Sequence, residues 1–260
     1  MVFLNQLAKK FRNTSSAKFI GITGSTGKTT VKTMLGTLLK EYSNTYFAPH
    51  SYNNHYGVPL SLCNMNLYHK YGVFEIGMSR QKEIYKLSAL VRPHIATITN
   101  ISEAHLENFK NIKGIAKAKS EIIYNIQKGG AIVLNRDDKF FNYFKKIAEK
   151  RKIRVISFGY SKKANIQFLN ILKDGENFLL KDLINKKRFD LNISNNNKNF
   201  IMNILCCLGI LEELNLSFSK IKKFFKYQSF LKGRGKINKV IKFNKKFFLI
   251  DESYNANPLS

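Results

Sequence analysis

Apolar positions in this chain fall into short runs that alternate with longer amphipathic stretches from residue 19 to about residue 158. The short runs are rich in β-branched and aromatic residues, and they predict strands at 19–22, 46–48, 71–76, 95–99, 131–134 and 153–158. Helical patterns lie between them at 31–39, near 60, and at 82–90, 112–126 and 140–150. This alternation predicts an α/β fold, a mainly parallel sheet with helices on both faces.

The second part of the chain has a different pattern. Residues 164–194 contain short alternating stretches with Asp-Gly and Lys-Asp turns, which predict a small antiparallel β appendage. An apolar helix is expected at 199–214 and an amphipathic helix at 218–227. Two strands around Asn244 are expected within 236–250.

Composition is that of a globular protein, with 260 residues and 44% hydrophobic residues. No run approaches the ~20 apolar residues of a membrane span, and the amino terminus becomes basic too early for a secretory signal. The cysteines Cys63, Cys206 and Cys207 lack the spacing of a metal site. We therefore expect a reducing compartment, the cytoplasm.

The charge is unusual, because 44 Lys and Arg against 17 Asp and Glu give +27. The lysines are spread along the whole chain among Asn, Ile and Phe, as an AT-rich coding sequence supplies them, and no arginine-rich arm occurs. We expect no specific nucleic-acid partner, although a basic nucleotide- or nucleic-acid-binding module stays an alternative. In either case the field favours polyanions such as nucleotides.

A glycine turn separates the first strand from an amphipathic helix, whose apolar stripe begins at Val31. Backbone N–H groups and the positive end of the helix dipole make such a turn an anion cradle. Lys28 is placed to reach a terminal phosphate, and the Thr29 hydroxyl to hold Mg²⁺. The match is to a shortened P-loop, because Ile22 stands where the strict pattern has its first glycine. The alternative is a turn that only reverses the chain.

Polar residues follow other strands, where ligands of parallel sheets bind. Glu75 ends a strand and is a candidate second Mg²⁺ contact, or else an ordinary strand-end acid. His105 follows the strand at 95–99, and it is either functional or a structural hydrogen-bonding residue. Lys119 is by sequence alone a solvated lysine. The turn cluster at 53–59 is suited to lining a ligand.

Taken together, these pieces resemble the Mur ligases, ATP-dependent amide-forming enzymes of peptidoglycan assembly, and within them the branch that adds D-alanyl-D-alanine. The matching segments occur in the family's order and cover nearly the whole chain. They are GITGSTGKTT (21–30), NNHYGVPLSL (53–62), FEIGMS (74–79), RPHIATITNISEAHLENF (92–109), IAKAKSEI (115–122), LNRDD (134–138), KGR (232–234) and DESYNANP (251–258).

The resemblance implies a role for each matching residue. Lys28 would bind the β- and γ-phosphates, Thr29 and Glu75 would bind Mg²⁺, and His105 would help to hold a second Mg²⁺. Lys119 falls where the family has a lysine carbamylated by carbon dioxide, and Arg234 would lie near the transferred phosphate. The remaining nucleotide-binding residues would be Gly24, Ser25, Thr26, Gly27, Thr30, Asn54, Asp138, Asn199 and Asp251.

The implied reaction joins D-alanyl-D-alanine to UDP-N-acetylmuramoyl-tripeptide with ATP, through an acyl phosphate. A folylpolyglutamate synthase-like ligase is the alternative enzyme. The family has three domains, so we expect 1–17 to be a remnant of an N-terminal domain or linker, and 18–235 to be the central ATP-binding domain. Residues 236–260 would be a linker and the start of a missing C-terminal domain, which a separate chain could supply. Lys198-Asn199 replaces the family's His-Asn pair, and Asp251-Glu252 replaces two aspartates.

Overall fold

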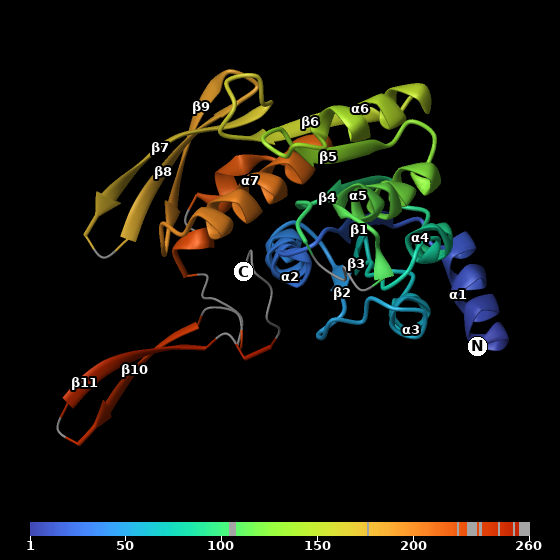
Figure 1. Ribbon diagram of the computed structural model, residues 1–260, viewed down its shortest axis with the longest axis horizontal. Coiled ribbons are helices and arrows are strands. Elements are labelled where there is room, and N and C mark those ends of the chain that lie inside the picture. Colours follow the sequence, from blue (N-terminus) through green and yellow to red (C-terminus); the bar gives the residue numbers. More distant parts are fainter. Residues whose placement is uncertain are drawn as a thin grey trace.

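The computed structural model describes residues 1–103, 108–175, 177–222, 224–227, 233, 236–243, 245–251 and 253–254, without the side chains of 236–238. Its main feature is a nine-stranded sheet in the order β2-β3-β1-β4-β5-β6-β7-β8-β9 (Figure 1). Neighbouring strands are parallel from β2 to β7, which confirms the predicted α/β fold class. The strands are β1 Lys18–Thr23, β2 Thr45–Phe47, β3 Tyr71–Glu75, β4 Ile95–Ile98, β5 Ala131–Asn135, β6 Arg154–Gly159, β7 Ile166–Asp174, β8 Asn177–Ile184 and β9 Lys187–Ile193.

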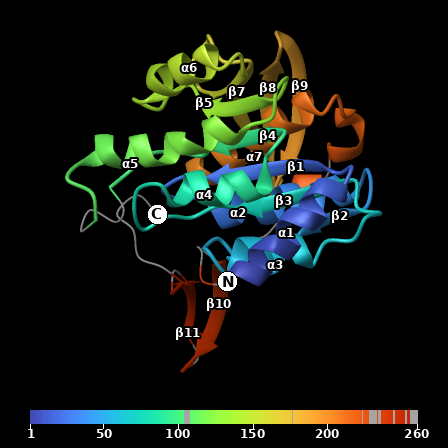
Figure 2. The ribbon, with the colours of Figure 1, turned by 90° about the vertical axis from the view of Figure 1, so that its right-hand side faces the viewer.

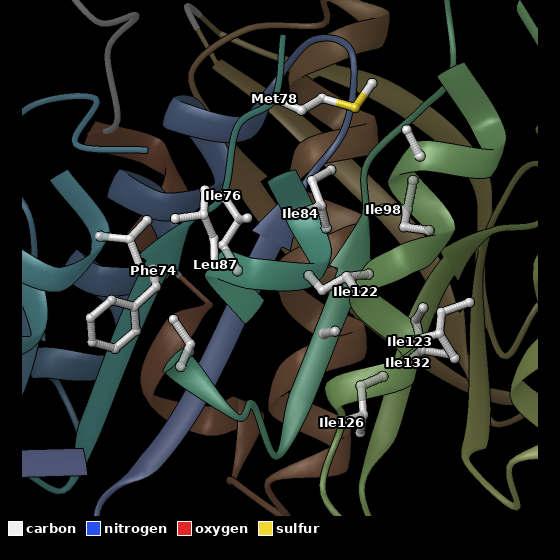
Figure 3. Packing of buried hydrophobic residues seen from close by; sticks show 14 of the residues in the cluster. Phe74, Ile76, Met78, Ile84, Leu87, Ile98, Ile122, Ile123, Ile126 and Ile132 are labelled. Carbon is white, nitrogen blue, oxygen red and sulfur yellow. The ribbon is translucent and has the colours of Figure 1, made fainter. Parts of the chain in front are cut away.

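Helices cover both faces of this sheet, as the alternating pattern predicts. One core lies beneath helices α1, α3, α4, α5 and α6, and Figure 3 shows Ile84 and Leu87 of α4 among the residues of this core. The other core lies beneath α2 and α7. The bounds are α1 Val2–Thr14, α2 Lys28–Lys40, α3 Gly57–Cys63, α4 Glu83–Val91, α5 Ile112–Ser120, α6 Phe141–Lys150 and α7 Lys198–Glu213.

The antiparallel stretch that the sequence predicts at 164–194 is present, and it continues the main sheet. Strands β7, β8 and β9 pair antiparallel with each other, and β7 pairs parallel with β6, so they extend the main sheet. The predicted strands near the end are β10 Lys236–Lys242 and β11 Lys245–Asp251, which form a two-stranded sheet. Both views show this hairpin standing apart from the main sheet (Figures 1 and 2).

The prediction of one amphipathic helix at 218–227 is wrong. This segment forms two 3₁₀ turns, η3 Phe218–Ile221 and η4 Phe224–Tyr227. The carbonyls of Lys222 and Phe225 accept hydrogen bonds from the backbone N–H groups of Asn192 and Ser194, beside edge strand β9. Because these carbonyls accept hydrogen bonds from the segment of strand β9, they do not accept the hydrogen bonds that would continue an α-helix.

Two other helices differ from the predicted pattern. The α-helix expected at 112–126 ends at Ser120 and continues as a 3₁₀ turn, η2 Glu121–Asn125. Residues 2–14, for which the sequence predicted no element, form α1, which packs against α3 and α4. No helix within the described part of the chain is long and apolar enough to cross a membrane.

Candidate active site

A cavity of about 1250 Å³ lies where strands β1, β3, β4, β5 and β6 end. This is the edge at which open parallel sheets bind ligands. Most of the predicted site residues line it, from the turn before α2, the loop after β2, the end of β3, α5 and the start of α7. They are Ser25, Thr26, Gly27, Lys28, Thr29, Thr30, Asn54, Glu75, Lys119 and Asn199.

The turn between β1 and α2 requires its glycines. Gly24 has φ +150°, and a Cβ there would lie 1.9 Å from Oγ1 of Thr99. Gly27 has φ +79°, and a Cβ there would lie 2.9 Å from Oδ1 of Asn203. The N–H groups of Ser25 and Thr26 donate to the backbone and side-chain oxygens of Asn100. The first turn of α2, whose N–H groups have no acceptor within the helix, is therefore the candidate anion-binding part of this segment.

Two lysines meet at one carbonyl of this turn. Nζ of Lys28 donates to the Gly24 carbonyl at 2.8 Å and to the Ser25 carbonyl at 3.2 Å. Nζ of Lys119 donates to the same Gly24 carbonyl at 2.9 Å. Lys119 is only 2% exposed, so the interpretation of it as a solvated lysine is wrong. Burial, and then the charge of Lys28, lower the pKa of Lys119 well below its usual value, which favours the neutral amine.

Hard oxygen ligands lie in the same cavity. Glu75 is 3% exposed; Oε1 accepts a 2.7 Å hydrogen bond from Nδ2 of Asn53, whereas Oε2 is buried and accepts none from the described residues. Oγ1 of Thr29 lies 3.0 Å from Oγ of Ser51. A buried carboxylate oxygen that accepts no hydrogen bond from the described residues, in a cavity that also holds a hydroxyl, fits Mg²⁺, which prefers such oxygens. Within the described residues, no three His, Cys, Asp or Glu side chains form a metal cluster.

Asn54 and Asn199 line the cavity, but their hydrogen bonds are local. Oδ1 of Asn54 accepts from the N–H groups of Tyr56 and Gly57 at the start of α3, and the backbone N–H of Asn199 donates to Oδ1 of Asn197. The Asn54 contacts hold its side chain beside the start of α3, whereas the Asn199 contact involves only its backbone at the start of α7. A nucleotide role for both stays a prediction.

Asp138 and Asp251 lie outside the residues that line the cavity. Asp138 accepts from the N–H groups of Ile101 and Phe140, and burial raises its pKa. Asp251 accepts from the backbone N–H of Gly233. Each carboxylate holds a loop near the site, and direct nucleotide contact stays a prediction. His105 and Arg234 lie outside the described residues.

Several lining residues, among them Ser51 and Asn203, were not predicted from the sequence. Ser51 and Asn53 are the partners of Thr29 and Glu75, and Asn53 belongs to the turn cluster that was expected to line a ligand. Asn203 approaches Gly27 from α7. The sequence signal for Asn203 was an amide among the otherwise apolar residues 200–211 of this helix.

Named relatives match over almost the whole of this chain. The UDP-N-acetylmuramoyl-tripeptide–D-alanyl-D-alanine ligase of Rickettsia prowazekii is 35% identical over 258 residues, which is 99% of this chain and 57% of the relative. The ligase of the same name from Escherichia coli is 29% identical and covers 97% and 55%. The chain therefore spans about half the length of the curated relatives it matches.

Solved structures of proteins with the same kind of name also match almost the whole of this chain. A crystal structure of MurF from Acinetobacter baumannii has a TM-score of 0.89 at 30% identity, covering 99% of this chain and 55% of that one. The MurF ligase of Thermotoga maritima in complex with ADP has a TM-score of 0.86 at 26% identity, covering 99% and 58%. A mutant of L. casei FPGS, with a TM-score of 0.68 at 13% identity and coverage of 92% and 69%, shares the fold alone.

The family model described as the Mur ligase middle domain matches residues 22–211, from the end of β1 to near the end of α7. This span contains the glycine turn, Glu75 and Lys119, which the structure brings to one cavity. The chain therefore belongs to the Mur ligase family.

Proposed function

We propose that this chain is the ATP-binding core of a ligase that joins D-alanyl-D-alanine to UDP-N-acetylmuramoyl-tripeptide. One observation carries the proposal: Lys28 and Lys119 converge on the Gly24 carbonyl, in a cavity that also contains the buried carboxylate of Glu75. The relatives that match this chain carry the name of that ligase, and one structural neighbour binds ADP.

In the proposed reaction, an oxygen of the tripeptide carboxylate attacks the γ-phosphorus of ATP, and the bond to the β-phosphate oxygen breaks to release ADP. The amine of D-alanyl-D-alanine then attacks the acyl phosphate, phosphate leaves, and the amine loses a proton as the amide forms. The protein has little covalent work in such a transfer. Lys28 would leave the Gly24 and Ser25 carbonyls to neutralise phosphate charge, and the first turn of α2 would bind phosphate oxygens.

Thr29 and Glu75 would hold one Mg²⁺, and His105 with Lys119 would hold a second. Magnesium supplies positive charge that neutralises the phosphate oxygens. Lys119 would serve as a carbamate, formed when its neutral amine attacks carbon dioxide and loses a proton. Its burial supports this proposal, because the lowered pKa favours the nucleophilic amine.

The nucleoside would lie toward the start of α7, where Asn199 lines the cavity. Asp138 and Asp251 would act near it by holding loops, and Arg234 would lie near the transferred phosphate. A folylpolyglutamate synthase-like ligase is the weaker candidate, because the FPGS structure shares only the fold. Ligation is expected when a polypeptide covering the rest of a relative's length is added as a separate chain, since domain closure completes such sites.

The test has two measurements. The first is ADP binding by the chain alone. The second is the release of ADP from ATP in the presence of UDP-N-acetylmuramoyl-tripeptide, D-alanyl-D-alanine and the added polypeptide. Lys28→Ala should abolish nucleotide binding, because it removes the cation of the phosphate cradle. Lys40→Ala, at the exposed end of the same helix, is the control and should bind normally. Unchanged ADP affinity in Lys28→Ala would contradict the phosphate cradle, and release with a folate acceptor instead of the dipeptide would favour the alternative ligase.

A further inference from the structure

Lys32 is a fully buried lysine on α2, one turn after Lys28 and Thr29. Its Nζ donates to the carbonyl of Ala48 at 2.5 Å and to the carbonyl of His50 at 2.8 Å. Burying an ammonium group is costly unless hydrogen bonds compensate it. An apolar residue of similar length would fill the same space at no such cost, so the charge itself needs a reason.

The two carbonyls belong to the loop that follows β2. Ala48 and His50 lie just before Ser51 and Asn53, which contact the candidate Mg²⁺ ligands. The backbone carbonyl of Asn53 also accepts from the N–H of Gly77, beyond the end of β3, at 2.7 Å. The loop is therefore fixed at one end by Lys32 and at the other by the strand that carries Glu75.

The helix geometry links Lys32 directly to this site. Lys32 and Thr29 are three residues apart on α2, so their side chains lie on the same face. One helix thus presents a candidate Mg²⁺ ligand and, one turn later, the cation that holds the loop around that ligand. A displacement of the loop would move Ser51 relative to Thr29 and Asn53 relative to Glu75 together.

We propose that Lys32 is a positioning residue: it anchors the loop at 48–54 so that Ser51 and Asn53 hold Thr29 and Glu75 in the arrangement that binds Mg²⁺. The inference rests on the proposed function, because it concerns the divalent cation of that site. It predicts that loss of the Lys32 ammonium weakens Mg²⁺ binding more than nucleotide binding without metal. The groups that orient metal ligands have such effects in other proteins.

Arg12 offers a matched control near the amino-terminal end of strand β1, away from the cavity at the carboxyl ends of the strands. It is 5% exposed and also donates to two backbone carbonyls, those of Val91 and Arg92, at 2.6 and 2.7 Å. Its guanidinium lies over the ring of Phe19, at the start of β1 rather than at its end. Arg12→Met therefore removes an equivalent buried anchor without touching the cavity.

The experiment titrates Mg²⁺ into the chain with ADP, and measures ADP affinity without Mg²⁺, by calorimetry. Lys32→Met should weaken Mg²⁺ binding by about tenfold or more while Mg²⁺-free ADP affinity stays within about twofold. Lys32→Arg, which keeps the charge and donors, should restore part of the loss. Arg12→Met should lower thermal stability and leave the Mg²⁺ titration unchanged.

An Mg²⁺ affinity of Lys32→Met that equals that of Arg12→Met would overturn the inference. If Lys32→Met does not fold, Lys32→Gln and Ser51→Ala decide, since both should weaken Mg²⁺ binding and an unchanged titration in both overturns the inference. A wild-type chain that binds no ADP, with or without Mg²⁺, would overturn the proposed function itself. The two failures can be told apart, because a failure of the Lys32 inference leaves ADP and Mg²⁺ binding by the wild-type chain intact, whereas a failure of the proposed function does not.

Discussion

Replacing Gly24 with alanine tests how closely the turn before α2 is packed. The added Cβ would lie 1.9 Å from Oγ1 of Thr99 and 3.1 Å from its backbone nitrogen. Oγ1 of Thr99 already donates to the carbonyl of Thr26, so it cannot move without breaking that bond. Either the turn or the end of β4 must therefore shift, and the Gly24 carbonyl that binds Lys28 and Lys119 shifts with the turn.

The size of the effect follows from a comparison with Gly129, which has φ +76° and where an added Cβ would meet no atom within 4 Å. Alanine carries a backbone cost at both glycines, ~1–2 kcal/mol in the left-handed region of Gly129 and ~1–3 kcal/mol at the positive φ of Gly24. Only Gly24→Ala adds overpacking, which typically costs ~1–3 kcal/mol. At about 2–4 °C per kcal/mol for chains of this size, we expect Gly24→Ala to melt roughly 2 to 12 °C below Gly129→Ala.

The assay combines thermal unfolding with ADP calorimetry for both variants. Hydrogen bonds to a charged group contribute ~1.5–3 kcal/mol, so misplacing Lys28 should weaken ADP binding by about ten- to a hundredfold in Gly24→Ala. Gly129→Ala should bind ADP as the wild type does, because Gly129 does not line the cavity. Equal melting temperatures together with equal ADP affinities would refute the packing argument.

Two further predictions concern buried titratable groups. Lys119→Ala should lose the release of ADP, and added acetate should restore part of it by taking the place of the carbamate. Lys117→Ala, at an exposed position of α5, is the control and should keep its activity. Failure of acetate to restore any activity would contradict carbamylation. Burial, and then the charge of Asp190, raise the pKa of Asp182 to about 8. The unfolded carboxyl ionises near pH 4, so the unfolded state binds fewer protons and stability should fall as pH rises from about 4 to about 8, by ~1.4 kcal/mol per pKa unit at most. Denaturant unfolding of Asp182→Asn should lack this slope, and parallel pH curves for both proteins would contradict the assignment.

The sheet and most helices were predictable from the sequence because their signal is local. Strand runs such as 131–134 and helical stripes such as 140–150 depend on the periodicity of burial, and the structure has β5 and α6 there. The prediction was wrong at 218–227, where the periodicity is helical but the carbonyls of Lys222 and Phe225 serve strand β9. Pairing with a strand distant in sequence leaves no local pattern.

The residues of the candidate site likewise fall into those that the local sequence predicts and those that depend on contacts between distant segments. The glycine turn, Lys28 and Thr29 are contiguous, so their spacing alone indicates a phosphate cradle. The supporting residues Ser51 and Lys32 were not predicted, because their roles depend on contacts across 22 and 16 to 18 residues. Among 44 basic residues, nothing in the local sequence distinguishes a buried lysine from a solvated one.

The two lysines on the Gly24 carbonyl should respond differently when a nucleotide binds. Lys28 also donates to Ser25, at the longer distance of 3.2 Å, so phosphate oxygens can replace both of its carbonyl acceptors at little cost. The Gly24 carbonyl then depends on Lys119, which is buried behind it. A carbamate on Lys119 retains one N–H, so this hydrogen bond can persist while the side chain gains two oxygens that share one negative charge. The geometry is therefore compatible with both forms of Lys119, whereas a methyl group at position 24 would disturb either one.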